Sequence, residues 1–234
     1  MIKAAVAIPV YKRDLSASEI ASFKRCLHIL GNHPLILVAP ANLDLSAYHK
    51  HAGKELNTVT FKERFFKSVK GYSELLLHRS FYTQFIAYDY ILIYQLDAWV
   101  FRDELLKWCK RDFDYIGAPW LDAPPVKKRK ALINLGHLLK NKVGNGGVSL
   151  RKVRTHLRWA WWVSFIFKLF PKNEDMIWSL FVPFKKPGTV EALHFAFELE
   201  PRKSYQITGK TLPFTCHAWE KYDPLFWQSF IRSQ

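Results

Sequence analysis

The 234-residue chain has few cysteines and no long uncharged hydrophobic segment. Its three cysteines, Cys26, Cys109 and Cys216, are scattered and odd in number, so they provide neither a disulfide framework nor the CxxC spacing of a metal site. We read them as core thiols. The apolar run from Ala4 ends at Pro9, before charged residues, which is too short for the core of a signal peptide. We therefore expect a cytoplasmic protein, with the inner face of the membrane as an alternative location.

Acidic residues are absent between Asp122 and Glu174. Basic residues crowd this interval, and they supply most of the excess of 35 Lys and Arg over 20 Asp and Glu, a net charge of +15. Such a block attracts anionic partners, whether nucleic acid, acidic lipid or a phosphorylated substrate. A solvated surface that only keeps the protein soluble is the alternative. The basic residues are Lys127, Lys128, Arg129, Lys130, Lys140, Lys142, Arg151, Lys152, Arg154, Arg158, Lys168 and Lys172.

The chain also lacks internal repeats and glycine-serine linkers, and its length suits a single domain. Short apolar runs at 3–10, 34–40 and 90–96 are typical of buried strands, and 57–61 is expected to be a further strand. Helical patterns separate them, at 19–30 with Ser18 as the cap and at 73–87 with Ser73 as the cap. This alternation predicts an α/β fold with a mostly parallel sheet. The stretch 122–129 is expected to be an exposed loop.

Asp97 follows the most apolar of these strands. In open α/β sheets, ligands bind at the carboxyl ends of the strands, so Asp97 and the segment 9–12 are expected to face one crevice. A buried carboxylate without a partner would cost several kcal/mol, on the order of 2–7 for a polar group, so Asp97 needs solvent, a cation or a donor. Alternatively, Asp97 only caps a helix over 98–109.

Three further segments carry residues that are able to bind a ligand or take part in a reaction. Segment 143–151 (VGNGGVSLR) permits positive φ angles and close approach of a ligand, or is a plain hairpin turn. Asn173, Glu174 and Asp175 precede an apolar run, where acids commonly begin a helix, whereas a functional role requires one of them to accept a proton. His217 lies in PFTCHAWEKY, and a lone histidine is more often structural than a ligand.

Together these segments resemble a known family. AIPVYK, YILIYQLDAWVF, DYIGAPW, VGNGGVSLR, NED and PFTCHAW occur in an order similar to that of a family of bacterial proteins classed with the GT-A-like, nucleotide-diphospho-sugar glycosyltransferases. The resemblance covers nearly the whole chain. It implies a GT-A-like fold with a Rossmann-type mixed sheet flanked by helices, in one domain whose donor half covers about 1–120 and whose acceptor half covers about 121–234.

The resemblance also implies roles for single residues. Asp97 corresponds to the end of a DxD-type metal motif and His217 to the late metal-binding histidine, with Mn²⁺ or Mg²⁺ as the cation. Gln95 stands where the motif has its first aspartate, so metal dependence is less secure than the fold. Asp175, or Glu174 in its place, corresponds to the catalytic base. The donor-binding residues would be Pro9, Val10, Tyr11, Arg79, Gln95, Asp97, Gly146 and Gly147, and the acceptor-binding residues Trp120, Lys127, Lys128, Arg129 and Lys130.

The function we predict is transfer of a sugar from a nucleoside diphosphate sugar to an acceptor hydroxyl, with inversion, in cell-envelope or surface glycan synthesis. The acceptor would be a glycan or a lipid-linked glycan. The apolar stretch Trp159–Phe167 is far shorter than the roughly 20 residues that span a bilayer, but its basic flanks suit peripheral membrane contact; a buried helix or a dimer contact is the alternative. A non-catalytic basic protein that binds nucleic acid or anionic membrane is the rival function, with nucleic acid the less favoured partner. A metal-dependent hydrolase is a weaker rival.

Overall fold

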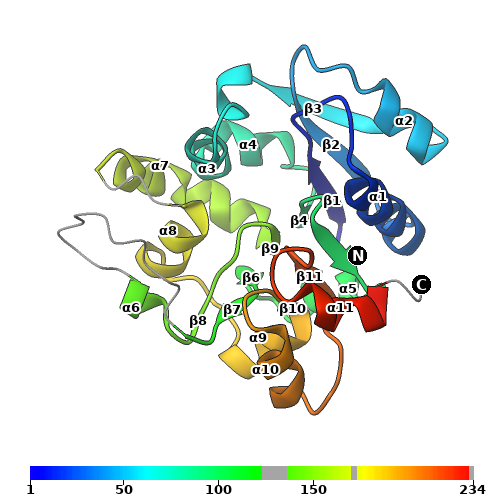
Figure 1. The fold of residues 1–234 in the computed structure, drawn as a ribbon. Coiled ribbons are helices and arrows are strands. Elements are labelled where there is room, and N and C mark those ends of the chain that lie inside the picture. The colour runs from blue at the N-terminus through cyan, green and yellow to red at the C-terminus, as the bar shows by residue number, and fades with distance from the viewer. Residues whose placement is uncertain (123–135, 170–172, 232–234) are drawn as a thin grey trace.

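A six-stranded mixed sheet forms the centre of the computed structural model, which describes residues 1–122, 136–169 and 173–231 (Figure 1). The strand order is β3-β2-β1-β4-β9-β6. Strands β1 to β4 are parallel, whereas β9 is antiparallel to both of its neighbours. The predicted α/β class and mixed sheet are therefore confirmed. The six strands are β1 (Ala4–Pro9), β2 (Leu35–Pro40), β3 (Asn57–Phe61), β4 (Tyr90–Tyr94), β6 (Tyr115–Gly117) and β9 (Val148–Lys152).

Two smaller sheets flank the central one. One has the order β10-β11-β5, from β5 (Ala98–Val100), β10 (Ala196–Phe197) and β11 (Thr215–His217), and the other pairs β7 (Pro119–Trp120) with β8 (Lys142–Val143). The helices are α1 (Ala17–Leu30), α2 (Ser46–Ala52), the 3-10 helix η1 (Glu63–Phe65), α3 (Val69–Leu77), α4 (Arg79–Gln84), α5 (Leu105–Cys109), α6 (Gly136–Leu139), α7 (Val153–Leu169), α8 (Glu174–Phe181), α9 (Thr189–Phe195), α10 (Pro201–Ile207) and α11 (Pro224–Ile231).

Helices cover both faces of the central sheet. Val6 and Leu92 face a cluster built with α1, α2 and α5, whereas their neighbours Ala7 and Ile93 face a cluster built with α3, α4, α7 and α8. Figure 1 shows these two groups of helices on opposite sides of the sheet. Burial of both faces explains why β1, β2 and β4 are continuous apolar runs, and it confines polar side chains to the strand ends. All three cysteines are buried and unpaired, as their spacing predicted.

The helix starts differ from the predicted ones. Ser16, not Ser18, caps α1, and it forms a capping box in which the Ser16 backbone N–H donates to the Glu19 carboxylate. Ser68, not Ser73, caps α3, and Ser73 is buried inside that helix. The predicted helix 73–87 is divided at His78, which has extended backbone angles and separates α3 from α4. Cap assignment failed because several serines precede each apolar pattern, and only backbone geometry selects one.

Helix α7 contains the apolar stretch of the sequence analysis. It has 17 residues and packs against α3, α4 and α8. Within 1–122, 136–169 and 173–231, no helix combines the length and apolar character that crossing a membrane requires.

Candidate active site

A cavity of about 710 Å³ opens where β1 and β4 end. The carboxyl ends of parallel strands are where α/β proteins bind ligands. Among the segments that meet here are the stretches after β1 and β4, the start of α3, the turn before β9, the start of α8 and the end of β11. The predicted site residues that line the cavity are Pro9, Val10, Tyr11, Gln95, Asp97, Gly146, Gly147, Glu174, Asp175 and His217.

Asp97 lies in a turn between β4 and β5. The turn is closed by the Ala98 backbone N–H, which donates to the Gln95 carbonyl at 3.0 Å. The alternative in which Asp97 caps a helix over 98–109 is wrong, because the chain continues as strand β5. Strand β5 pairs with β11 in a register that sets Ala98 opposite His217. That pairing brings two residues 120 positions apart into contact, with His217 Nε2 lying 3.1 Å from Asp97 Oδ1.

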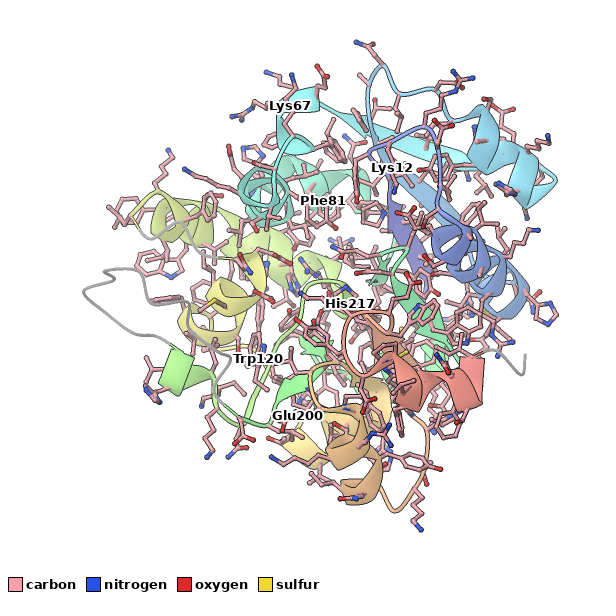
Figure 2. All side chains as sticks on the ribbon, in the orientation of Figure 1. Lys12, Lys67, Phe81, Trp120, Glu200 and His217 are labelled. Atoms are coloured by element: carbon pink, nitrogen blue, oxygen red, sulfur yellow. The ribbon has the colours of Figure 1, made fainter. Side chains whose placement is uncertain are left out.

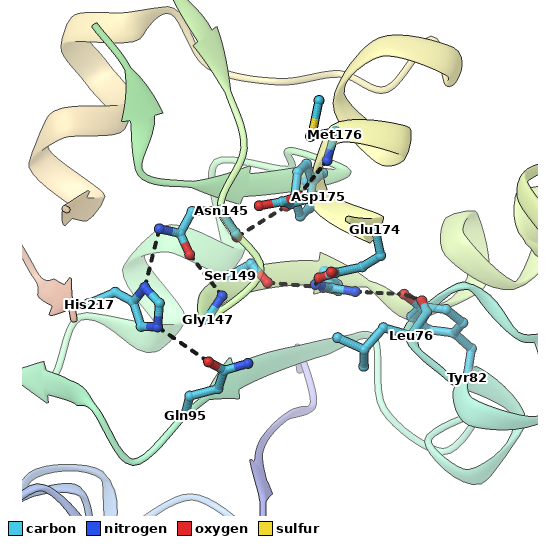
Figure 3. A network of polar contacts seen from close by, with 12 residues as sticks. Leu76, Tyr82, Gln95, Asn145, Gly147, Ser149, Glu174, Asp175, Met176 and His217 are labelled. Atoms are coloured by element: carbon cyan, nitrogen blue, oxygen red, sulfur yellow. Dashed lines mark hydrogen bonds and ion pairs between the residues drawn. The ribbon is translucent and has the colours of Figure 1, made fainter. Parts of the chain in front are cut away.

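The imidazole of His217 is surrounded by acceptors. Its Nε2 is also 3.3 Å from Gln95 Oε1, and its Nδ1 is 3.0 Å from Glu198 Oε1. Burial alone would lower the pKa of His217, but the hydrogen bonds and charges of Asp97 and Glu198 outweigh burial and raise it to about 10. Burial would likewise raise the pKa of Asp97, but His217 holds it below its ordinary value. Both groups are charged at neutral pH. Figure 3 shows His217 between Gln95 and Asn145.

In the turn before β9, neighbouring side chains lie too close to leave room for a Cβ at Gly146 or Gly147. Asn145, with φ of 79°, is the residue with a positive φ here, so the expectation that the glycines supply positive φ is wrong. A Cβ on Gly146 would lie 2.1 Å from Glu174 Oε1, and a Cβ on Gly147 would lie 2.0 Å from His217 Nε2. The hairpin alternative is also wrong, because β8 pairs with β7 while β9 pairs with β4 and β6. The turn lets the backbone pass directly beneath the site's acid and imidazole.

Glu174 is held by a buried arginine. Its Oε1 accepts a hydrogen bond from Arg151 Nη2 at 2.9 Å, and the Arg151 side chain is fully buried. Arg151 also donates to Tyr82 Oη and Ser149 Oγ, each at 3.0 Å. Figure 3 follows this chain of contacts from Glu174 to Tyr82. Arg151 is therefore not part of a solvated basic surface, which its place in the basic block had allowed. It is instead the fixed ion-pair partner of Glu174.

Asp175 lies next to this pair and has a different environment. Its Oδ1 accepts from the Met176 backbone N–H at 2.7 Å, and no cationic side chain among the described residues bonds to it. Burial, and then the negative charge of Glu174, raise the pKa of Asp175 to about 7. Asp175 is therefore able to exchange a proton near neutral pH.

Several site residues were missed by the sequence analysis. Glu198 follows the apolar segment that ends in β10, and β10 pairs with β11 so that Phe197 lies opposite Cys216, which places Glu198 level with His217. The signal was present, since an acid directly after an apolar strand is also the pattern at Asp97. Lys67 was missed as well, whereas Lys12 belongs to the segment 9–12 that was expected to face this crevice; both line the cavity, and Figure 2 shows both above His217 in this view. Lys12 pairs with Glu19 at 2.7 Å.

Other predicted residues are not brought to the cavity. Arg79 is exposed at the first position of α4 and does not line the cavity, because the helix break at His78 turns it away. Trp120 is buried, and its ring fills the space beside Gly144, where a Cβ would lie 1.9 Å from the ring. Lys127, Lys128, Arg129 and Lys130 lie outside the described residues.

The side chains around His217 provide part of the coordination that a divalent cation requires. Within the described part of the chain, no group of three or more His, Cys, Asp and Glu side chains forms a ready-made metal cluster. However, the Asp97 and Gln95 oxygens lie 3.1 and 3.3 Å from His217 Nε2, close to the roughly 3 Å that separates neighbouring ligands around an ion with bonds of about 2.1 Å. Glu198 on the other ring nitrogen is the usual outer partner of a metal-binding histidine. The set fits a cation that takes its other ligands from a diphosphate or water.

The mixed sheet with a cavity at its strand ends is the GT-A glycosyltransferase fold. Similar solved structures include core-mannan synthase A from Aspergillus fumigatus in its Mn/GDP form, with a TM-score of 0.58, 8% identity, and coverage of 80% of this chain and 72% of that chain. The galactosyltransferase LgtC in complex with donor and acceptor sugar analogs has a TM-score of 0.56 at 12% identity, covering 98% and 95%. Mouse xyloside xylosyltransferase 1 has 0.55 at 12%, covering 92% and 97%.

The chain belongs to the DUF5672 family, described as protein of unknown function, whose model matches residues 55–217. A comparison with curated proteins gave no match. The resemblance stated from the sequence is thus confirmed for the GT-A fold, while the bacterial origin and the diagnostic value of the individual blocks stay predictions.

Proposed function

We propose that this protein is a glycosyltransferase that moves a sugar from a nucleoside diphosphate sugar to an acceptor hydroxyl. The observation that carries the proposal is the composition of one cavity in a GT-A fold, which is lined by the charged pair Asp97–His217 and by Asp175, an acid with a pKa of about 7. A protein that only holds anions on a basic surface has no need of these acids. The rival of a non-catalytic basic protein therefore explains less of the site.

The donor would lie along the ends of β1 and β4. The ring of Tyr11 is 61% exposed beside the cavity and is free to stack on a nucleobase. Gly146 and Gly147 leave the backbone open on the side of the sugar and diphosphate. Lys12 and Lys67 line the same cavity, where Lys12 is paired with Glu19 and Lys67 with Glu63, and a diphosphate would compete with these carboxylates for the two cations.

Asp97 and His217 would hold a Mn²⁺ or Mg²⁺ ion, with Gln95 Oε1 as a neutral third ligand. When bound, the cation supplies charge neutralisation for the departing diphosphate. Asp97 suits the role because its pKa is lowered and its carboxylate stays ionised. Glu198 fixes the orientation of the imidazole through Nδ1. Core-mannan synthase A, which has the same fold, is described in an Mn/GDP form, and this supports the proposal by analogy.

Asp175 would accept the proton of the acceptor hydroxyl as that oxygen attacks the sugar. A base with a pKa near the working pH combines an ionised state with useful basicity. Direct attack assisted by one base inverts the anomeric centre. Glu174 would act on Asp175 through its charge, since Arg151 already occupies its carboxylate.

The acceptor would be a glycan or a lipid-linked glycan used in cell-envelope or surface glycan synthesis. The support for this part is the acid-free interval between Asp122 and Glu174, whose cations favour an anionic acceptor.

Thermal shift with a panel of nucleotide-sugars, with and without Mn²⁺, tests the proposal in wild type and Asp97→Asn. One donor should raise the melting temperature of the wild type more with Mn²⁺ than without. Asp97→Asn should fold but melt at a lower temperature alone, because it loses its charge pair with His217, and it should lose the Mn²⁺-dependent part of the donor shift, because the amide keeps the shape and removes the charge. Asp44→Asn is the matched control, since the Asp44 side chain has the same exposed fraction, 49%, and lies outside the cavity. No donor effect, together with salt-sensitive binding of nucleic acid, would favour the rival.

A further inference from the structure

Helix α7 presents an exposed face that the catalytic site does not use. Trp161, Phe165 and Leu169 recur at intervals of four residues and are 66%, 51% and 57% exposed. The opposite face, with Val163 and Phe167, is buried against α3 and α4. The sequence stretch Trp159–Phe167 is thus divided between core and surface, and the apolar surface stripe extends beyond it to Leu169.

Basic side chains share this face of α7. Arg154 and Arg158 lie about two turns and one turn before Trp161, respectively, and Lys168 lies beside Leu169; all three are exposed. The helix carries no acidic residue. Trp161, Trp162 and Phe165 form a continuous aromatic surface, with ring centroids 6.0 and 6.2 Å apart. Large apolar groups that alternate with cations along one helix face are typical of helices that lie in a membrane interface.

A second cavity of about 570 Å³ lies between α3 and α7, at the border between the buried face of α7 and this exposed face. Arg64, Lys70 and Lys168 supply its positive charge, and Leu77 and Phe167 supply its apolar wall. Its one carboxylate, Glu74, is paired with Arg64 at 3.1 Å. Lys70 and Lys168 have no ion-pair partner within the described residues. The cavity therefore has unbalanced positive charge next to an apolar stripe, which matches a phosphate group at the head of an acyl chain.

We propose that the exposed face of α7 and this second cavity dock the protein on an anionic phospholipid membrane, with one lipid phosphate between Lys70 and Lys168. The aromatic stripe enters the headgroup region while the cations meet the surface charge. A second copy of the chain fits less well, because a two-fold contact through this face would bring the same cations of both copies together without an acid on α7 to offset them. The inference does not depend on the proposed sugar transfer.

Docking in this way would set the active site close to the membrane. Val69, at the start of α3, lines the catalytic cavity, and the next residue, Lys70, lines the second cavity. The two cavities therefore lie on either side of the same helix start. An acceptor carried on a lipid would reach the catalytic cavity from the lipid surface without leaving it.

Flotation of the full chain with vesicles tests the proposal. The wild type should float with vesicles of phosphatidylcholine and phosphatidylglycerol in equal parts, should not float with phosphatidylcholine alone, and should be released by salt. Arg154→Gln with Arg158→Gln should weaken binding by about 30-fold, because each basic residue near the surface contributes about a factor of five. Trp161→Ser with Phe165→Ser should weaken it by about 10-fold or more through lost insertion.

Matched controls remove the same groups elsewhere. Lys24→Gln with Lys50→Gln deletes two exposed cations on α1 and α2, and Val190→Ser with Leu225→Ser deletes two exposed apolar side chains on α9 and α11. Both control pairs should float as the wild type does, and all variants should show wild-type melting temperatures. Equal flotation of the α7 variants and the controls would overturn the proposal. So would a stable dimer in vesicle-free solution that Trp161→Ser with Phe165→Ser dissociates, because the face would then be covered by a second copy.

Discussion

At the scale of single residues, neighbouring acids in this chain have different chemistry because their partners differ. Glu174 and Asp175 are adjacent, yet Glu174 is bonded to the buried Arg151 while Asp175 accepts only the Met176 backbone N–H in the described structure. Burial, and then the negative charge of Glu174, raise the pKa of Asp175. The two neighbouring carboxyl groups therefore differ in environment. In active sites, such a difference commonly separates the pKa values of two acids and so gives them different roles.

Asp175→Asn should lower turnover by roughly 10² to 10⁴-fold with little change in donor affinity, because a base acts only in the chemical step. The wild type should show a rise in turnover with pH centred near 7, since only the ionised carboxylate accepts a proton. Sugar transfer by product mass and donor affinity by calorimetry measure the two effects separately.

Glu174→Gln is the control for Asp175→Asn. It should shift the pH limb to lower pH, because a negative neighbour of Asp175 is removed, and should destabilise the fold by about 3–5 kcal/mol by leaving Arg151 buried without its partner. Full activity in both variants would rule out a base at either position. Unfolding of Asp175→Asn would instead support a purely structural role at the start of α8.

His217 makes stability depend on pH in metal-free protein. Its folded-state pKa of about 10 lies above the ordinary value of 6.5, so its charge stabilises the fold fully below about pH 6.5, and this contribution is lost as pH rises towards 10. Each unit of pKa difference corresponds to about 1.4 kcal/mol, so the loss should be on the order of a few kcal/mol. Urea unfolding of wild type and His217→Gln at several pH values, with a chelator, measures it. Parallel stability curves for the two proteins would show that His217 is not paired as described.

At the scale of elements, the site depends on how closely the turn before β9 passes under the residues above it. Gly147 contributes its carbonyl to the Gln95 backbone N–H at 2.9 Å, while its Cα faces His217. Asn145 stabilises the turn by accepting the Gly147 N–H at 2.8 Å. These contacts fix the distance between the turn before β9 and His217 at the end of β11.

Gly147→Ala should displace His217, because the new Cβ would lie 2.0 Å from Nε2. We expect a loss of about 1–3 kcal/mol of stability from overpacking and a loss of Mn²⁺-dependent donor binding. Gly188→Ala is the control, since a Cβ there meets nothing within 4 Å, and it should bind donor as the wild type does. Chemical denaturation and calorimetry report the two effects. Native stability and affinity in Gly147→Ala would contradict this packing.

At the scale of the whole molecule, one cavity is assembled from segments throughout the chain. Strand β9, from the second half of the sequence, lies between β4 and β6 in the central sheet. The expected donor half, about 1–120, and the expected acceptor half, about 121–234, thus share one central sheet. That the first half binds the donor and the second the acceptor stays a prediction.

The proposed base predicts the stereochemical outcome for the molecule as a whole. Attack assisted by Asp175 on the face opposite the departing diphosphate should give a product with the anomeric configuration inverted relative to the donor. Proton NMR of the product formed early in the reaction distinguishes the two configurations. A product with the donor's configuration would exclude Asp175 as the base of a single displacement, while leaving the proposed donor site intact.

The sequence by itself determined the α/β class and the strands that are buried on both faces, and it predicted roles for Asp97 and the acids 174–175. Each of these is local information, since a strand buried on both faces must be continuously apolar and a carboxylate at its end must find a partner. Cap positions were the exception, because Ser16 and Ser18 are chemically equivalent until backbone geometry selects one.

Only the tertiary structure decided which residues act together. The pairing of β5 with β11 joins Asp97 to His217, and the pairing of β10 with β11 adds Glu198. Burial in β9 turned Arg151 from a member of a basic block into the partner of Glu174, and the break before α4 removed Arg79 from the cavity. These outcomes depend on strand register and on packing between segments far apart in the chain. No local pattern of side chains encodes them, because register and burial are fixed only when the whole sheet forms.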